Sequence, residues 1–110
     1  SQFPVFDDNN DVCELINNNT ISRWLSFQLE DNGTIVIDNV KVADLLTKIE
    51  FRENYLFVSR NTSIYEAYDL FIKQINKKER NLDALFITHS GKKNEKILGL
   101  ITIEDIAGLF

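Results

Sequence analysis

The chain has 110 residues, 44% of them hydrophobic, and a formal net charge of −5. This is the size of one domain with enough apolar residues for a core, and its acidity argues against a nucleic-acid or anionic-membrane surface, because phosphate binding needs clustered Lys and Arg. The single cysteine, Cys13, excludes an internal disulfide and fits a reducing compartment. No apolar run approaches the roughly 20 residues that span a bilayer, so we expect a cytoplasmic module without membrane contact.

The first third of the chain predicts two strands and a helix. Residues 2–6 and 12–16 have the composition of short strands, and the turn-forming run DDNND joins them. Cys13 is expected to be a small buried side chain on the second strand. A helix is predicted over 18–28 and is ended by Asp-Asn-Gly; its apolar face holds Ile21, Trp24, Leu25 and, at its edge, Leu29.

The remainder predicts strands alternating with helices. We expect a strand at 34–37, a short helix at 42–47 and a buried strand at 56–59. The clearest helix is 63–76, with a capping box formed by Ser63 and Glu66 and an apolar face made of Ile64, Ala67, Tyr68, Phe71 and Ile75. Strands at 84–88 and 97–101 follow on either side of a polar loop, and Thr102 opens the last helix.

An internal repeat relates the two ends of the chain. The first 29 residues predict strand, strand, helix, which is the second half of the strand-helix-strand-strand-helix order predicted from Tyr55 onward. The alignment allows four extra loop residues in the later copy. It pairs Glu14 with Gly99, Asn17 with Thr102, Thr20 with Asp105, and Ile21 with Ile106.

The repeat predicts an α+β fold made of two pseudo-symmetric β-α-β-β-α units. Half a unit cannot cover its own sheet, so we expect the two units to pack through their sheets. The first unit lacks its N-terminal strand and helix. The sequence also contains no methionine, so we expect a piece of a longer protein.

Two stretches of the later copy resemble the cystathionine β-synthase (CBS) domain family. NTSIYEAYDLF at 61–71 is similar to the family's first helix, and KILGLITIEDI at 96–106 is similar to its Gly-x-x-Thr-x-x-Asp signature. In the earlier copy, QFPVFD at 2–7 looks like the strand before that signature. The resemblance implies a tandem pair, with a partial first motif and linker at 1–47 and a complete second motif at 48–110.

The resemblance also implies a function. CBS pairs are regulatory modules that sense small ligands, most often adenine nucleotides, S-adenosylmethionine or cyclic dinucleotides, and they are not themselves catalytic. By resemblance, Asp105 would receive the ribose hydroxyls and Thr102 would contact ribose or phosphate. The base pocket would comprise Phe57, Val58, Ser59 and Ile101. The resemblance implies no catalytic residue, metal or resident cofactor, and it implies a homodimer formed through sheet or helix faces.

The Thr102–Asp105 pair has two interpretations that the residues leave open. A carboxylate can hold a vicinal diol with its two oxygens, and Gly99 removes a side chain where a ligand or a neighbouring backbone would approach. The same spacing resembles a capping box, which stabilises a helix by about 1 kcal/mol without any ligand.

The earlier copy departs from the signature. It has Glu14, Asn17 and Thr20 where the later copy has glycine, threonine and aspartate. The ribose-binding carboxylate is therefore missing, and Glu14 would intrude on a pocket. We expect this first-copy site to be degenerate, or to accept something other than a ribose, and at most one good site per chain.

Three other groups of residues are candidates for a functional site. Asp7, Asn9 and Asp11 copy the opening of a calcium loop, but Val12 and Asn18 replace its essential glycine and glutamate, so a solvated hairpin turn is favoured. His89, the one histidine, lies beside a polar loop, and a catalytic role for it is disfavoured. The cluster Lys92, Lys93 and Lys96 is either a phosphate contact or a solubilising loop, of which the loop is favoured.

The sequence is therefore compatible with two functions. The first is a nucleotide-sensing regulatory module, and the alternative is a ligand-free structural domain for dimerisation or interaction within a larger protein. An enzyme is disfavoured, because the sequence contains no nucleophile–base pair, metal quartet or Gly-rich phosphate loop.

Overall fold

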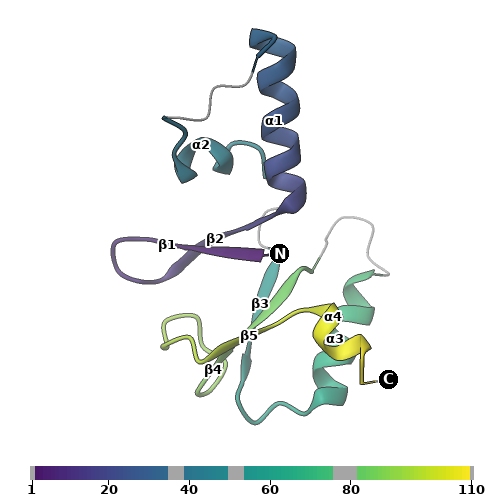
Figure 1. Ribbon diagram of the computed structural model, residues 1–110. Coiled ribbons are helices and arrows are strands. Elements are labelled where there is room, and N and C mark those ends of the chain that lie inside the picture. The colour runs from purple at the N-terminus through teal and green to yellow at the C-terminus, as the bar shows by residue number, and fades with distance from the viewer. Residues whose placement is uncertain (1, 35–38, 50–53, 76–81, 110) are drawn as a thin grey trace.

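The computed structural model describes residues 2–34, 39–49, 54–75 and 82–109. The first half contains the hairpin strands β1 (Gln2–Phe6) and β2 (Val12–Asn17) and the helices α1 (Asn18–Asn32) and α2 (Val42–Leu46). The second half contains β3 (Tyr55–Ser59), α3 (Ile64–Ile75), β4 (Ala84–Thr88), β5 (Gly99–Ile101) and α4 (Ile103–Ala107). Figure 1 shows α1 and α2 at one end of the molecule, the β3–β5 sheet with α3 and α4 at the other, and the hairpin between them.

The elements follow the sequence expectations closely, and the α+β fold is confirmed. Helix α1 runs four residues further than predicted and ends where Gly33 adopts the left-handed conformation at φ 70° and donates its N–H to the Leu29 carbonyl at 3.0 Å. Strand β5 starts only at Gly99. The strand predicted at 34–37 lies outside the described residues except for Thr34, which is not in a strand.

The second half is a three-stranded sheet with order β3-β4-β5. Strands β3 and β4 pair in parallel through the crossover helix α3, whereas β4 and β5 pair antiparallel. The predicted capping box opens α3, since the Glu66 N–H donates to the Ser63 hydroxyl at 3.1 Å and the Ser63 N–H to the Glu66 carboxylate at 3.4 Å. Ala67 and Phe71, four residues apart, are buried, whereas Ile64 in the first turn is 52% exposed, contrary to its predicted place on the apolar face.

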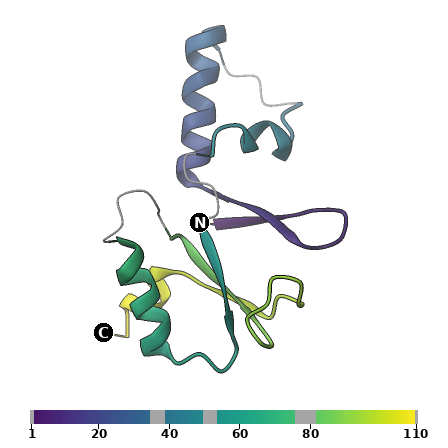
Figure 2. The same cartoon turned by 180° about the vertical axis from the view of Figure 1, so that it is seen from behind.

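Two hydrophobic clusters cover the two faces of this sheet. Helices α3 and α4 lie on one face, as Figures 1 and 2 show, and build a cluster around Val58, Phe71, Leu85 and Ile106. On the other face, Val12 and Leu15 of β2 pack against the sheet. Strand β4 is therefore covered on both sides, which explains its continuous apolar run.

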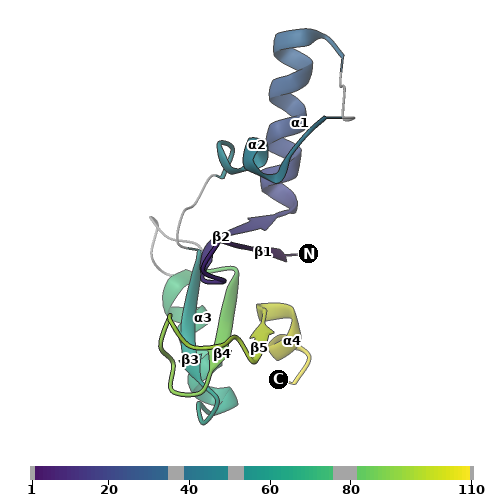
Figure 3. The same cartoon turned by 90° about the vertical axis from the view of Figure 1, so that its left-hand side faces the viewer.

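Aromatic residues dominate the contact between the hairpin and the sheet. The Phe57 and Phe86 rings stack at 5.4 Å, and Tyr55 meets both of them edge-on at 5.9 Å and 5.5 Å. The Tyr55 hydroxyl donates to the Cys13 carbonyl at 3.3 Å. Figure 3 shows the hairpin seated at the end of the sheet where β3 begins.

Cys13 itself is exposed, contrary to the expectation that it would be buried. The register of the hairpin moves from Val5–Glu14 to Phe6–Val12, so that Cys13 has no paired residue opposite it. Such a bulge interrupts the alternation of side chains along a strand. Cys13 therefore leaves the core face, and its thiol lies 3.3 Å from the Val5 carbonyl.

The two halves share the order β-β-α. Asn17 and Thr102 are both N-cap residues, so Glu14 and Gly99 occupy the same place three residues earlier. Glu14 pairs with Val5, and Gly99 pairs with Ile87. Nine positions separate the first pair and twelve the second, so the later loop is longer by three residues rather than the four that the alignment allowed.

Candidate functional site

The helix starts of the two halves each hold a pair of polar residues. We call Thr102 and Asp105 the α4 box, and Asn17 and Thr20 the α1 box. Both boxes begin where an antiparallel strand feeds a helix, and both N-cap residues are extended, at φ −112° and ψ 167° for Thr102 and φ −121° and ψ 179° for Asn17. An extended N-cap leaves the first backbone N–H groups to be satisfied by side chains.

The α4 box is exposed and uses only part of its hydrogen-bonding capacity. Asp105 Oδ2 accepts from the Thr102 N–H at 2.9 Å and from the Thr102 hydroxyl at 3.2 Å. Asp105 Oδ1 accepts no hydrogen bond from any residue that the structure describes. The Asp105 side chain is exposed, and that of Thr102 is half-buried. The carboxylate therefore caps the helix with one oxygen and keeps the other available to a hydroxyl or amine.

In the α1 box, Thr20 is buried and Asn17 half-buried, and both side chains make hydrogen bonds within the fold. Asn17 Oδ1 accepts from the Thr20 N–H at 3.0 Å and from the Thr20 hydroxyl at 3.1 Å, and the Asn17 N–H donates to Thr20 Oγ1 at 3.4 Å. Thr20 is only 2% exposed. Because its hydroxyl both donates and accepts within the box, it has little left to offer a ligand.

Asn17 also joins the two halves of the molecule. Its Nδ2 donates to Asp83 Oδ2 at 2.8 Å, and the same oxygen accepts from the amide of Asn54. The Asp83 N–H donates to the Asn54 carbonyl at 2.8 Å. Asn54 is 1% exposed. The first-copy site is thus replaced by a network that ties the start of α1 to the starts of β3 and β4.

Sequence reasoning missed Asp83 and Asn54. The only local signal is a polar residue directly before each of the strands β3 and β4. Their partner Asn17 lies 66 positions from Asp83 along the chain, so no spacing rule connects them. The third residue expected in the first-copy site, Glu14, is half-buried on β2 opposite Val5.

The residues predicted to line a base pocket fall on two faces of the sheet. A small cavity of about 70 Å³ lies between the end of β3, the start of α3 and α4, and its lining includes Val58, Ser59 and Ile101. Phe57 packs on the opposite face against the hairpin cluster, because neighbouring strand residues alternate. Thr102 and Asp105 adjoin the lining residues Ile101 and Ile106 but do not line the cavity themselves. This volume is below the roughly 300 Å³ of small-molecule sites.

Two glycines near the site differ in what they require. A Cβ on Gly99 would lie 3.4 Å from the Ile87 methyl group, an ordinary contact, so packing within the chain does not require glycine there. Gly91 has φ 82°, and a Cβ there would meet the Ser59 nitrogen at 3.0 Å. Gly91 therefore allows the β4–β5 loop to approach the end of β3, and the Ser-Gly pair in its sequence is the signal for this turn.

A carboxylate organises the β4–β5 loop. Glu95 Oε1 accepts from the N–H groups of Lys92 at 2.9 Å and Ser90 at 3.0 Å and from the Thr88 hydroxyl at 3.1 Å, while Oε2 accepts from the Ser90 hydroxyl at 2.8 Å. The hydrogen bonds from the Lys92 backbone and from the Ser90 hydroxyl lower the pKa of Glu95 from 4.5 to about 2. The loop is therefore built around an ionised glutamate.

The remaining candidates show no arrangement for chemistry. His89 and the cluster of Lys92, Lys93 and Lys96 are exposed. Asp7 closes its hairpin turn, accepting from the N–H groups of Asn9 at 2.8 Å and Asp11 at 3.0 Å. Within the described residues, no group of three or more His, Cys, Asp and Glu could hold a metal ion. No helix in the described ranges is both long and apolar enough to cross a membrane.

One of three comparisons with known proteins identifies a family. The family model of the CBS domain matches residues 42–110, more than half of the chain. Comparisons with curated proteins and with solved structures found no match. CBS domains are generally regulatory modules that sense ligands and do not themselves catalyse reactions. The chain therefore belongs to the CBS domain family.

Proposed function

We propose that this chain is a regulatory CBS-pair module that senses an adenine nucleotide or a related adenosyl ligand at the α4 box. The single observation that carries the proposal is the state of Asp105, which is exposed and uses one carboxylate oxygen for capping. Its other oxygen remains an acceptor, and the shared oxygen has further lone-pair capacity. Together they suit the two neighbouring hydroxyls of a ribose, so that capping and ligand binding are compatible roles of one side chain.

One ligand site per chain follows from the contrast between the boxes. The α1 box has no carboxylate, and its hydrogen bonds are made within the fold and to Asp83. The base of the ligand would reach towards Val58, Ser59 and Ile101, whose small cavity would have to widen to hold it. Gly99 leaves room on β5 for this approach, and the lysines of the β4–β5 loop are the nearest candidates in sequence for a phosphate contact.

The tandem arrangement is supported by an apolar groove on the first half. The groove has a volume of about 510 Å³, and its lining includes Phe3, Val5, Ile16 and Ile21. By the shared register and N-cap positions, these residues correspond to Leu85, Ile87, Ile101 and Ile106, all of which belong to the cluster beneath α3. A strand and an amphipathic helix like β3 and α3 would complete the first copy here.

The test is ligand-induced stabilisation in a panel of AMP, ADP, ATP, S-adenosylmethionine and a cyclic dinucleotide. A ligand at 100 times its dissociation constant should raise the free energy of unfolding by roughly 2.7 kcal/mol. The Asp105→Asn variant should lose this response. Glu104→Gln is the matched control, because Glu104 is also exposed in the first turn of α4. A panel without any response from the folded protein would contradict the proposal.

A second candidate function is a ligand-free interaction domain that dimerises within a larger protein. The exposed apolar side chains of Phe3, Phe6 and Val42, at 50%, 46% and 52%, favour it, because they surround the groove of the first half. Sedimentation should then show a homodimer that no nucleotide alters, and Asp105→Asn should leave assembly unchanged. In both functions the exposed thiol of Cys13 suits the reducing cytoplasm.

A further inference from the structure

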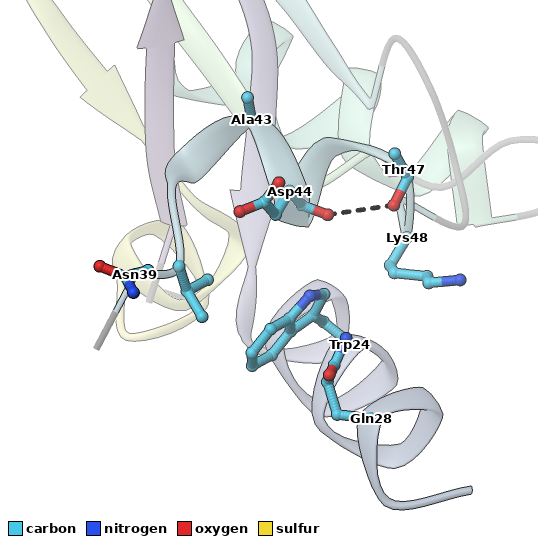
Figure 4. Close-up of a pocket in the computed structure, with 8 residues that line it drawn as sticks. Trp24, Gln28, Asn39, Ala43, Asp44, Thr47 and Lys48 are labelled. Carbon is cyan, nitrogen blue, oxygen red and sulfur yellow. Dashed lines mark hydrogen bonds between the residues drawn. The ribbon is translucent and has the colours of Figure 1, made fainter. Parts of the chain in front are cut away.

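A second groove lies between α1 and α2 (Figure 4). Figure 1 shows these two helices at the opposite end of the molecule from α4. Its volume is about 430 Å³, within the range of roughly 300–1,000 Å³ in which small-molecule sites fall. One wall is formed by Trp24 of α1, and α2 with the residues beside it forms the other. No residue of the α4 box lines this groove.

The indole of Trp24 presents an unused hydrogen-bond donor to the groove. Trp24 is only 7% exposed, yet its ring N–H makes no hydrogen bond to any residue that the structure describes. Figure 4 shows the indole nitrogen on the edge of the ring that faces Asp44 across the groove. Because an indole N–H can only donate, this position offers a donor to an acceptor on a ligand that enters the groove.

Asp44, on the other wall, presents a hydrogen-bond acceptor to the groove. Its Oδ2 accepts from the Lys41 N–H at 2.9 Å, whereas Oδ1 accepts from none of the described residues. The neighbouring Thr47 hydroxyl donates to the Asp44 backbone carbonyl at 3.0 Å, the dashed line in Figure 4, and so does not reach the carboxylate as a donor. Asp44 is exposed, and an ionised carboxylate only accepts, so this side of the groove offers an acceptor to a ligand's donor and disfavours an anion.

Among the described residues that line the groove, Lys48 is the one cation, and it is directed elsewhere. Lys48 places its ammonium group 3.6 Å from the centroid of the Phe27 ring. Figure 4 shows the Lys48 side chain extending away from Asp44. The negative charge of Asp44 is therefore not compensated by Lys48.

We propose that this groove is a second, separate ligand site for a small neutral molecule whose flat edge carries an acceptor beside an N–H donor. Aromatic primary amides and amino-substituted heterocycles have this edge. The acceptor meets the Trp24 N–H, the amino group donates to the Asp44 carboxylate, and the ring lies against the apolar part of the groove. The site excludes carboxylates and phosphates because of Asp44, which distinguishes its ligands from nucleotides.

The test uses Trp24 as its own reporter, because it is the only tryptophan of the chain. Its fluorescence is followed, with excitation at a wavelength that tyrosine does not absorb, while benzamide or benzoate is added to the whole chain. The two probes have the same shape, but benzoate lacks the amino donor and carries a negative charge. We expect a saturable change with benzamide and an affinity for benzoate that is lower by about tenfold or more, as for loss of a hydrogen bond to a charged group.

Two variants complete the test. Asp44→Asn should weaken benzamide binding by about tenfold, whereas Asp105→Asn should leave it unchanged, and circular dichroism confirms that each variant is folded. If Asp44→Asn unfolds, the comparison of the two probes on the unaltered chain still decides. Quenching that is linear in benzamide, equal binding of both probes, or a folded Asp44→Asn variant with full affinity would each overturn the proposal.

Discussion

The α1 box and the α4 box occupy the same place in the fold, yet their polar atoms have different partners. Both follow an antiparallel strand and open a helix with an extended N-cap. In the α1 box, Thr20 is 2% exposed and Asn17 reaches across to Asp83. In the α4 box, Asp105 is exposed and caps with a single oxygen. The shared spacing therefore fixes the local backbone, whereas burial decides whether the side chains are left for a ligand.

This difference predicts that position 105 of the repeat tolerates a carboxylate better than position 20. A buried carboxylate needs a counter-charge or several donors to offset the loss of water. Position 20 is beside the Asn17 oxygen and near Asp83, so it offers little compensation. Position 105 keeps its contact with water. The degeneracy of the first-copy sequence is thus coupled to the packing of the two halves.

Restoring the signature in the first copy should produce the largest effect. The Thr20→Asp variant would bury a charge beside the side-chain oxygen Oδ1 of Asn17, and we expect the free energy of unfolding at neutral pH to fall by about 3 kcal/mol. Since burial raises the pKa of such a carboxyl, the loss should diminish as the pH falls below its folded-state pKa. Urea denaturation at pH 7 and pH 4 measures both. A variant as stable as the unaltered chain would break the comparison.

Removing the N-caps should produce the next largest effect and should be unequal. Asn17→Ala removes a cap and the hydrogen bond to Asp83, and we expect a loss of about 2 kcal/mol. Thr102→Ala removes a cap side chain alone and should cost about 1 kcal/mol or less. The two variants are matched controls for each other in equilibrium urea denaturation. Equal losses would mean that the bond to Asp83 contributes nothing to stability.

Local patterns predicted the elements well. The Ser63–Glu66 box and the spacing of Ala67 and Phe71 predicted α3, and the glycine at position 33 predicted the end of α1. The alignment of the two copies also paired Asn17 with Thr102, and both residues are N-caps in the structure. These features depend on neighbours within four residues, so the sequence contains them directly.

What the sequence could not predict depends on contacts between distant segments. The exposure of Cys13 results from a bulge that only the pairing of β1 with β2 reveals. The sequence predicted that Phe57 and Val58 would line the same base pocket. Phe57 instead lies on the face of the sheet that the hairpin covers, and the hairpin is more than 35 positions away along the chain. The burial of Thr20, which is 2% exposed, likewise has no signal in the sequence around it. Single-sequence patterns indicate which face is apolar, but they do not indicate what covers it.

The β4–β5 loop predicts that the stability of the fold depends on pH in the acidic range. The pKa of Glu95 is lowered to about 2, so its contribution to stability is complete above its ordinary value of 4.5 and is lost as the pH falls through about 2. In Glu95→Gln, this dependence between pH 4.5 and pH 2 should disappear. Thermal unfolding across that range measures it, with Glu30→Gln on the exposed face of α1 as control. Parallel curves for the Glu95 variant and the unaltered chain would contradict the assignment.

The smallest effect on stability is expected at Gly99, and it sharpens the comparison most directly. In the first copy the equivalent residue is Glu14, so a side chain is accommodated at this position of the fold. A Cβ on Gly99 would make an ordinary contact of 3.4 Å with Ile87, so Gly99→Ala should change the free energy of unfolding by less than about 0.5 kcal/mol. If the glycine serves a ligand, the same variant should reduce nucleotide-induced stabilisation. Gly108→Ala is the control, because a Cβ there meets nothing within 4 Å. An unchanged ligand response in Gly99→Ala would mean that the ligand does not approach this strand.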